Sequence, residues 1–183
     1  MRLKPVPEPP GELARVRELQ RAVPLVPGSE DDCCARLRDR CDLPNRQVAN
    51  DWLAFLRALG LAAETSRGFE RTEAEPTLER VREGLREGVL FASEALDLLR
   101  EASPDDPVTA DMLFETTRES VPRHDRARDP DWESTWCDRA DRLLRWLALV
   151  DLATPVDLPD GERNEADSSV DDPAVGYVAG NAV

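Results

Sequence analysis

Residues 43–72 read LPNRQVANDWLAFLRALGLAAETSRGFERT, and the order of residue types indicates one helix followed by a small hairpin. Pro44 favours a first helical turn and Gly60 favours a helix stop, so we expect a helix over residues 44–59. At 100° per residue its apolar side chains fall within about 80° of one another, the width of one core-facing stripe. This stripe comprises Val48, Trp52, Phe55, Leu56 and Leu59. The opposite side carries Arg46, Asn50, Leu53 and Arg57.

The segments LAAET and FERT follow Gly60 and flank the tripeptide Ser-Arg-Gly at residues 66–68. Short segments separated by a glycine-containing turn predict a hairpin, with Gly68 in the positive-φ region. Arg67 then lies at the tip of the hairpin and Arg71 on its second strand.

Two helices are expected before this stretch. Residues 12–22 place apolar side chains at three- and four-residue spacing, and Pro24 ends the pattern. Ser29 is suited to cap the next helix, with Asp32 three residues later in a capping-box arrangement. The side chains expected to face inward from this second helix are Cys33, Cys34, Leu37 and Cys41.

Helix, helix, tight turn, helix and hairpin is the order of a winged helix-turn-helix module, and residues 12–72 resemble that superfamily. The resemblance implies that residues 44–59 form a recognition helix and residues 61–72 a wing. It also suggests that the link PLVPG, residues 24–28, supplies a small third strand.

Residues 77–180 repeat this plan more loosely. Helices are expected over residues 77–102, 107–121 and 131–150, and the alternation of Val175 and Tyr177 suits a returning wing strand. Placing Leu61 on Leu152 gives an offset of 91 residues and aligns apolar positions of the two third helices. The alternative is an irregular helical half, because the segment PRHDRARDPD is long for a helix-turn-helix connection. Residues 158–174 form an acidic excursion.

The chain as a whole is acidic, with 38 Asp and Glu residues, 24 Lys and Arg residues and a formal net charge of -14. All but one of the basic residues are arginine, and the acids are spread along a chain with 40% hydrophobic residues. This pattern is typical of a folded acidic surface and resembles cytosolic proteins of salt-loving archaea. Near molar salt the Debye length falls to about 3 Å, so net charge alone does not exclude a nucleic-acid partner.

Charge is distributed unevenly. Residues 43–72 carry four arginines and three acids, a net charge of +1, whereas residues 151–183 carry one arginine and eight acids, a net charge of -7. In the aligned third helices, Cys137, Asp141 and Ala148 stand where the first module has Arg46, Asn50 and Arg57. We therefore expect only the first module to contact DNA.

Six residues are candidates for that contact: Arg46, Gln47, Asn50, Arg57, Arg67 and Arg71. Arg46 and Asn50 lie on the early turns of the expected recognition helix, where arginine suits a guanine edge and asparagine an adenine edge, and Gln47 flanks them. Arg57 is placed to meet a phosphate, and the wing arginines to meet the backbone or a minor groove. This reading expects the helix and hairpin to face outward together, with guanidinium groups free of internal ion pairs. The simpler reading is that these are ordinary solvated arginines, and an exposed Leu53 among them also suits a protein partner.

The sequence contains few of the residues and motifs that would indicate an enzyme. The chain has one histidine, His124, and none of the familiar phosphate-loop, dinucleotide, zinc-protease or hydrolase motifs. A metal site built from His124 and the four cysteines stays open, but no CxxC spacing is present and helical spacing explains three cysteines as core. We expect no catalytic residues, no cofactor and no metal.

No apolar run approaches the roughly 18 residues of a membrane span, so we expect a cytoplasmic protein with thiol cysteines.

The sequence therefore predicts a mainly α protein with small β-hairpin wings, built from tandem winged-helix-like modules over residues 1–75 and 76–183. The predicted function is DNA-binding transcriptional regulation through the first module, with the second serving self-association, a partner protein or support. The alternative is a tandem winged-helix scaffold that binds proteins and not nucleic acid.

Overall fold

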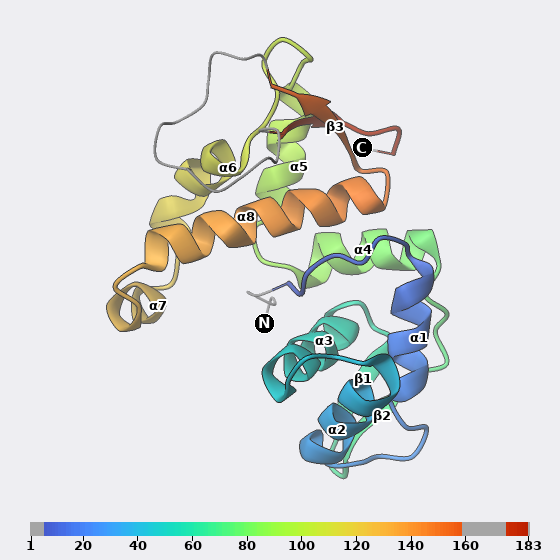
Figure 1. The fold of residues 1–183 in the computed structure, drawn as a ribbon. Coiled ribbons are helices and arrows are strands. Elements are labelled where there is room, and N and C mark those ends of the chain that lie inside the picture. The colour runs from blue at the N-terminus through green and yellow to red at the C-terminus, as the bar shows by residue number, and fades with distance from the viewer. Residues whose placement is uncertain (1–5, 159–174, 183) are drawn as a thin grey trace. The chain divides into compact units, whose positions relative to one another are not determined.

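The computed structural model describes residues 6–158 and 175–182 and divides the chain into two compact units, residues 1–92 and 93–183. Each unit is helical with one antiparallel hairpin (Figure 1). The first unit contains α1 (Ala14–Ala22), α2 (Glu30–Cys41), α3 (Arg46–Ala58), β1 (Ala62–Thr65), β2 (Gly68–Arg71) and α4 (Leu78–Gly88). The second contains α5 (Ala92–Glu101), α6 (Ala110–Thr117), the 3-10 helix η1 (Arg118–Ser120), α7 (Arg123–Arg128), α8 (Trp132–Leu149), β3 (Ala153–Asp157) and β4 (Val175–Ala179).

The first unit folds as its sequence pattern predicts. Ser29 caps α2, since its hydroxyl accepts a hydrogen bond from the backbone N–H of Asp32 at 3.1 Å and donates to that residue's carboxylate at 2.8 Å. Helix α2 packs against α1 and α3, and α3 packs against β1 and α4. The core side chains contributed by α2 are those predicted to face inward: Cys33, Cys34, Leu37 and Cys41.

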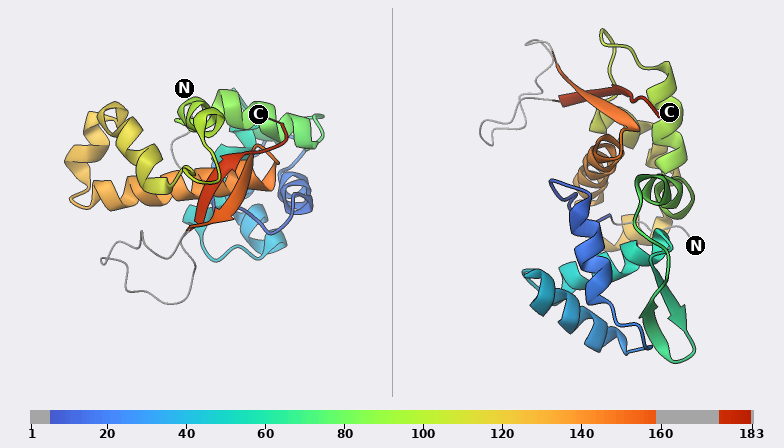
Figure 2. Two further views of the ribbon diagram at one scale, coloured as in Figure 1. Left: turned by 90° about the horizontal axis from the view of Figure 1, so that it is seen from above. Right: turned by 90° about the vertical axis from the view of Figure 1, so that its right-hand side faces the viewer.

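The hairpin β1–β2 closes with Thr65 opposite Gly68, so that Ser66 and Arg67 form a two-residue loop. Gly68 has a φ of 121°, as the turn chemistry predicts. A Cβ atom at this position would lie 2.1 Å from the carbonyl oxygen of Gly28, so glycine is required by space as well as by conformation. Figure 2 shows the hairpin, in green, extending beyond the helices of its own unit.

The α1–α2 link supplies a third strand in its smallest form. Gly28 and Phe69 form an antiparallel bridge with N–H···O=C distances of 3.0 and 2.8 Å. The second unit has the same kind of antiparallel bridge between Val108 and Tyr177, with both N–H···O=C distances 2.8 Å. The small third strand predicted for residues 24–28 is therefore present as a single bridged residue.

The second unit places its hairpin after its longest helix, as the first unit does. Strands β3 and β4 pair antiparallel from Ala153 opposite Ala179 to Asp157 opposite Val175, which confirms the predicted returning strand. Helix α8 packs against α6, α7 and β3. Almost all of the predicted acidic excursion, residues 159–174, lies outside the described residues.

Residues related by the 91-residue offset also make equivalent backbone hydrogen bonds. The N–H of Leu61 donates to the carbonyl of Leu56 at 2.8 Å, and the N–H of Leu152 donates to the carbonyl of Leu147 at 2.9 Å. Helices α3 and α8 therefore end in the same turn before the first strand of each hairpin. The tandem winged-helix architecture is thus present in the structure, and the irregular helical alternative is not.

Several helix boundaries differ from the sequence prediction. Asn45 caps α3, so the helix begins at Arg46 and Pro44 lies before it. The single helix predicted over residues 77–102 is two helices, α4 and α5, separated near Phe91 at a φ of 67°. The segment predicted as a long loop contains α7. Helical periodicity continues through a short break when both helices bury apolar faces, so the pattern does not reveal the break.

Helix α4 belongs by packing to the first unit, although the sequence places the module boundary at residue 75. A Cβ atom on Gly84 would lie 2.6 Å from the Cα of Leu59, and one on Gly88 would lie 2.5 Å from the carbonyl oxygen of Ala58. These two glycines therefore let the backbone of α4 approach the end of α3 closely.

The sequence pattern predicts an exposed Leu53 beside the arginines of α3, and this is wrong: only 1% of Leu53 is exposed. The reason is that α3 is buried over more than one stripe. Ala49, Leu53 and Leu56 form a second row at spacings of four and three, and all three are buried. Leu53 is therefore a core residue and not a surface anchor.

Candidate nucleic-acid interface

The early turns of α3 present polar side chains because the helix start is fixed by a cap. The side-chain oxygen of Asn45 accepts a hydrogen bond from the backbone N–H of Val48 at 2.9 Å. This leaves Arg46 and Gln47 exposed and Asn50 half-buried. The structure therefore places Arg46 and Asn50, the two side chains predicted to read base edges, on the early turns of α3 together with Gln47.

Two of these three side chains already have carboxylate partners. The Arg46 guanidinium donates to Asp31 and lies 4.0 Å from Glu30, both on the first turn of α2. The Gln47 amide donates to Asp51 at 2.9 Å. The ion pair of Arg46 lies at the surface, since 66% of the Arg46 side chain and 76% of the Asp31 side chain are exposed.

Arg57 lies at the other end of α3, beside the wing. Its guanidinium donates to Glu64 on β1 and lies over the Phe69 ring at 5.2 Å from the centroid. Residues 46 and 57 are separated by roughly 16 Å along the helix at 1.5 Å per residue. The candidate residues therefore form two groups, one at each end of α3.

The wing carries the two remaining arginines. Arg67 is exposed at the tip, where its backbone N–H donates to the Thr65 hydroxyl at 3.2 Å. Arg71 is half-buried on β2, and its backbone N–H donates to the carbonyl of Pro24 at 2.7 Å. Within residues 6–158 and 175–182, neither side chain has an ion-pair partner.

The expectation that the arginines stand free of internal ion pairs is therefore wrong for Arg46 and Arg57 and holds for Arg67 and Arg71 in the described part of the chain. In a chain with 38 acidic residues, an exposed arginine beside another helix or strand readily meets a carboxylate. The acidic first turn of α2, with Glu30 and Asp31, was the signal for the Arg46 pair. The sequence could not show that these acids pair with Arg46, because the pairing depends on how α2 packs against α3.

The matching surface of the second unit lacks the same donors. Cys137, aligned with Arg46, is half-buried, and its thiol donates to Asp111 at 3.1 Å. Asp141, aligned with Asn50, accepts from Arg145 at 2.8 Å. The exposed donor groups of a recognition helix are therefore found on α3 and not at the aligned positions of α8.

The cysteines are free thiols with raised pKa values. Burial is the largest cause of the raised pKa of Cys33, Cys34 and Cys41. Burial, together with the hydrogen bond to Asp111, raises the pKa of Cys137 to about 12. These thiols stay protonated near neutral pH, which disfavours nucleophilic chemistry. Among the residues that the structure describes, no three His, Cys, Asp or Glu side chains are grouped as metal ligands.

Comparison with protein families places this geometry in a known context. Residues 1–168 match the family model described as the halobacterial double winged helix domain. The chain belongs to this family. The double winged helix domain agrees with the two helical units and their hairpins, and the halobacterial description fits the acidic, lysine-poor composition. No curated protein and no solved structure matches the chain. No helix in the described ranges is long and apolar enough to cross a bilayer.

Proposed function

We propose that this double winged helix domain is a cytoplasmic transcriptional regulator whose first unit binds double-stranded DNA. The observation that carries the proposal is the wing. Arg67 and Arg71 lie on an extending hairpin, without ion-pair partners in the described residues, beside a recognition helix that carries further donors. Arginine in this position suits a DNA backbone or a narrow minor groove.

The ion pairs of Arg46 and Arg57 oppose DNA binding only weakly. Both are surface pairs, with 66% and 41% of the arginine side chains exposed. Exposed ion pairs contribute about 0–1 kcal/mol to stability, and a phosphate offers arginine the same paired oxygen acceptors as a carboxylate. A DNA phosphate or a guanine edge can therefore replace Asp31 or Glu64 at small cost.

The proposed roles follow the two groups of residues. Arg46, Gln47 and Asn50 read base edges in the major groove, where arginine suits guanine and amides suit adenine. Arg57, Arg67 and Arg71 contact the backbone or the adjacent minor groove, which fixes register without reading sequence directly.

The second unit is proposed to serve self-association, binding of a partner protein or support of the first unit, and not to bind DNA. Its aligned helix positions carry Cys137, Asp141 and Ala148, and residues 151–183 have a net charge of -7 from one arginine and eight acids. Acidic side chains there repel phosphates at short range even when salt screens distant charges.

The alternative function, a protein-binding scaffold that does not contact nucleic acid, loses the residue that favoured it. Leu53 is its candidate anchor, and Leu53 is buried. The exposed apolar side chains of Leu25 and Val26 also suit a contact with a protein. Such a contact is compatible with DNA binding by α3 and the wing.

The test is a titration of the full chain against a fluorescent pool of random-sequence DNA duplexes at several KCl concentrations. We expect binding whose affinity falls as KCl rises. Arg67→Ala and Arg71→Ala each reduce the steepness of that fall by about one phosphate contact, whatever the sequence. In duplexes selected from the pool, Arg46→Ala relaxes the preference at one base position.

The matched control is Arg17→Ala, which removes an exposed arginine of α1 that lies outside the candidate interface. It should leave both affinity and salt dependence unchanged. The proposal fails if the unaltered chain does not bind DNA at any KCl concentration, or if Arg17→Ala weakens binding as much as Arg67→Ala does.

A further inference from the structure

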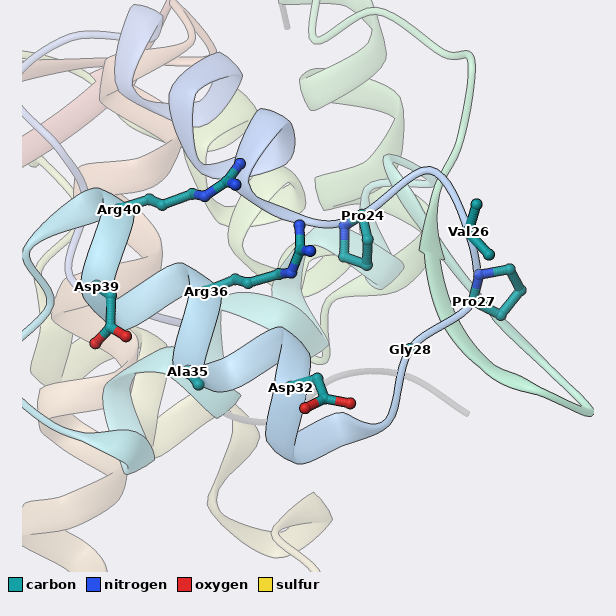
Figure 3. Close-up of a pocket in the computed structure, with 9 residues that line it drawn as sticks. All are labelled: Pro24, Val26, Pro27, Gly28, Asp32, Ala35, Arg36, Asp39 and Arg40. Carbon is teal, nitrogen blue, oxygen red and sulfur yellow. The ribbon is translucent and has the colours of Figure 1, made fainter.

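A groove of about 480 Å³ runs along α2 beside the α1–α2 link (Figure 3). None of the six candidate DNA-binding residues lines it. The link contributes Pro24, Val26 and Pro27, and α2 contributes Ala35, Arg36 and Arg40.

The link displays exposed apolar side chains. Leu25 is 66% exposed and Val26 is 73% exposed, more than the other large hydrophobic residues found exposed in the described part of the chain, Met112 and Val175, at 39% and 37%. Adjacent exposed aliphatic side chains beside a groove are compatible with an interaction surface.

The link is also held in place, so these side chains are presented on a fixed backbone. The carbonyl of Pro24 accepts from Arg71 at 2.7 Å, and Gly28 exchanges two hydrogen bonds with Phe69 at 3.0 and 2.8 Å. The four-residue span from Pro24 to Pro27 is therefore tied to β2 immediately at its start and just beyond its end. A surface that is already ordered loses little conformational entropy when it binds a partner.

The charges of the groove balance locally, although the chain carries -14. Asp32 and Asp39 accompany Arg36 and Arg40, a net charge of zero. The Asp39 carboxylate forms an ion pair with the Arg38 guanidinium at an N–O distance of 2.8 Å. Arg36 and Arg40 have no ion-pair partner among the described residues. Figure 3 shows both of these arginines directed to the same side of α2, and Asp32 near the Gly28 end of the groove.

We propose that this groove is the contact between two copies of the chain, related by a two-fold axis near Arg36. Asp32, Arg36 and Arg40 form one row at four-residue spacing along α2. When two such rows run antiparallel, Arg40 of each copy lies opposite Asp32 of the partner subunit, and these two ion pairs outnumber the one like-charge contact between the two Arg36 side chains near the axis. The same surface thus carries both the acid and the arginine of the intersubunit ion pair. A two-fold interface requires this self-complementarity, because both subunits contribute the same patch.

The balance of charge favours a second copy over the other possible occupants. A nucleic acid needs a net excess of positive charge, and the four charged residues that line the groove, two acids and two arginines, have a net charge of zero. A strongly acidic chain repels its own copies least where its surface is locally neutral, and Val26, which lines the groove, adds exposed apolar area that the partner subunit covers. At near-molar salt, where the Debye length is about 3 Å, local complementarity of this kind outweighs the net charge.

The test measures the mass of the full chain by sedimentation equilibrium in near-molar KCl, without DNA, over a wide concentration range. We expect the mass to rise from 20.4 kDa toward twice that value with increasing concentration. Val26→Asp and Arg40→Asp should each weaken the dimer at least tenfold. The exchange of both charges, Asp32→Arg with Arg40→Asp, should restore it relative to Arg40→Asp alone.

Two control variants make the same chemical changes outside the groove. Met112→Asp alters an exposed apolar residue of the second unit, and Arg17→Asp reverses an exposed charge of α1. Both should associate like the unaltered chain, and circular dichroism checks that every variant is folded. A mass of 20.4 kDa at all concentrations, or a dimer unaffected by Val26→Asp and Arg40→Asp, would overturn the proposal. Because DNA is absent, neither result bears on DNA binding.

Discussion

At the scale of single residues, Gly68 sets the geometry of the first wing. Its φ is 121°, and a Cβ added there would lie 2.1 Å from the carbonyl oxygen of Gly28, which leaves no room for a side chain. We expect Gly68→Ala to lower the free energy of unfolding by about 1–3 kcal/mol, the usual cost of a residue forced into this region. Urea unfolding measures the change.

The control for this substitution is Gly11→Ala, because a Cβ on Gly11 meets no atom within 4 Å. It removes the same backbone freedom from the unfolded chain without strain in the folded one. Equal urea midpoints for the two variants would show that the wing turn tolerates a side chain.

Asp31 is the residue that competes with DNA for Arg46 under the proposed function. Asp31→Asn removes the competing carboxylate, so we expect DNA affinity to rise about twofold to fivefold, corresponding to the weak energy of an exposed pair. The random-duplex titration measures this change. Asp39→Asn removes the same charge from the same helix, where its partner is Arg38, and it should alter affinity much less. Equal effects of both variants would indicate a general charge effect and no competition.

At the scale of elements, close packing of α4 on α3 depends on glycine. A Cβ on Gly84 would lie 2.6 Å from backbone and 2.8 Å from side-chain atoms of Leu59. Alanine raises helix propensity by about 1 kcal/mol, but overpacking a core costs about 1–3 kcal/mol. Because the nearest atom belongs to the backbone and cannot turn aside, we expect strain to win and Gly84→Ala to lower the thermal unfolding midpoint.

Glu87→Ala serves as the control for α4, since Glu87 is exposed on the same helix. Calorimetry should show little change for this variant. A higher unfolding midpoint for Gly84→Ala than for the unaltered chain would mean that α4 moves away from Leu59 easily.

The order of elements could be predicted from the sequence, whereas several boundaries could not. Ser29 as a cap, the inward cysteines of α2 and the hairpin glycine are local features, and the structure confirms each. The break at Phe91 and the helix α7 escaped prediction. A buried face on both sides of a break preserves the apolar period, so the period alone does not locate the break.

At the scale of the whole molecule, the net charge of -14 makes folding depend on salt. Raising KCl from about 0.1 M to about 1 M shortens the Debye length from about 10 Å to about 3 Å and weakens repulsion among surface acids. We expect the thermal unfolding midpoint to rise steadily over this range. A series in sucrose, which stabilises folded chains without screening charge, separates the two effects. A midpoint that is flat or falls with KCl would contradict the expectation.

The two units share a plan that the sequence revealed through an offset of 91 residues. The residue two positions after the last helical residue of α3 and of α8 adopts positive φ, 71° at Gly60 and 59° at Asp151. An apolar alignment was sufficient to find this repeat because both units bury equivalent helix faces. The candidate DNA-binding residues were found in the same way, from their place on the first recognition helix and wing, and their role is a prediction that the DNA titration tests.

The sequence by itself determined the helix faces, the caps, the wing turn, the repeat and the uneven charge, because each follows from spacing or backbone preference within a few residues. Only the tertiary structure decided that Leu53 is buried, that Arg46 meets Asp31 fifteen positions away and that Leu25 and Val26 stand exposed beside a groove. These features depend on the angle and distance at which separate elements pack. Local sequence patterns do not encode that geometry; the whole set of packed side chains does.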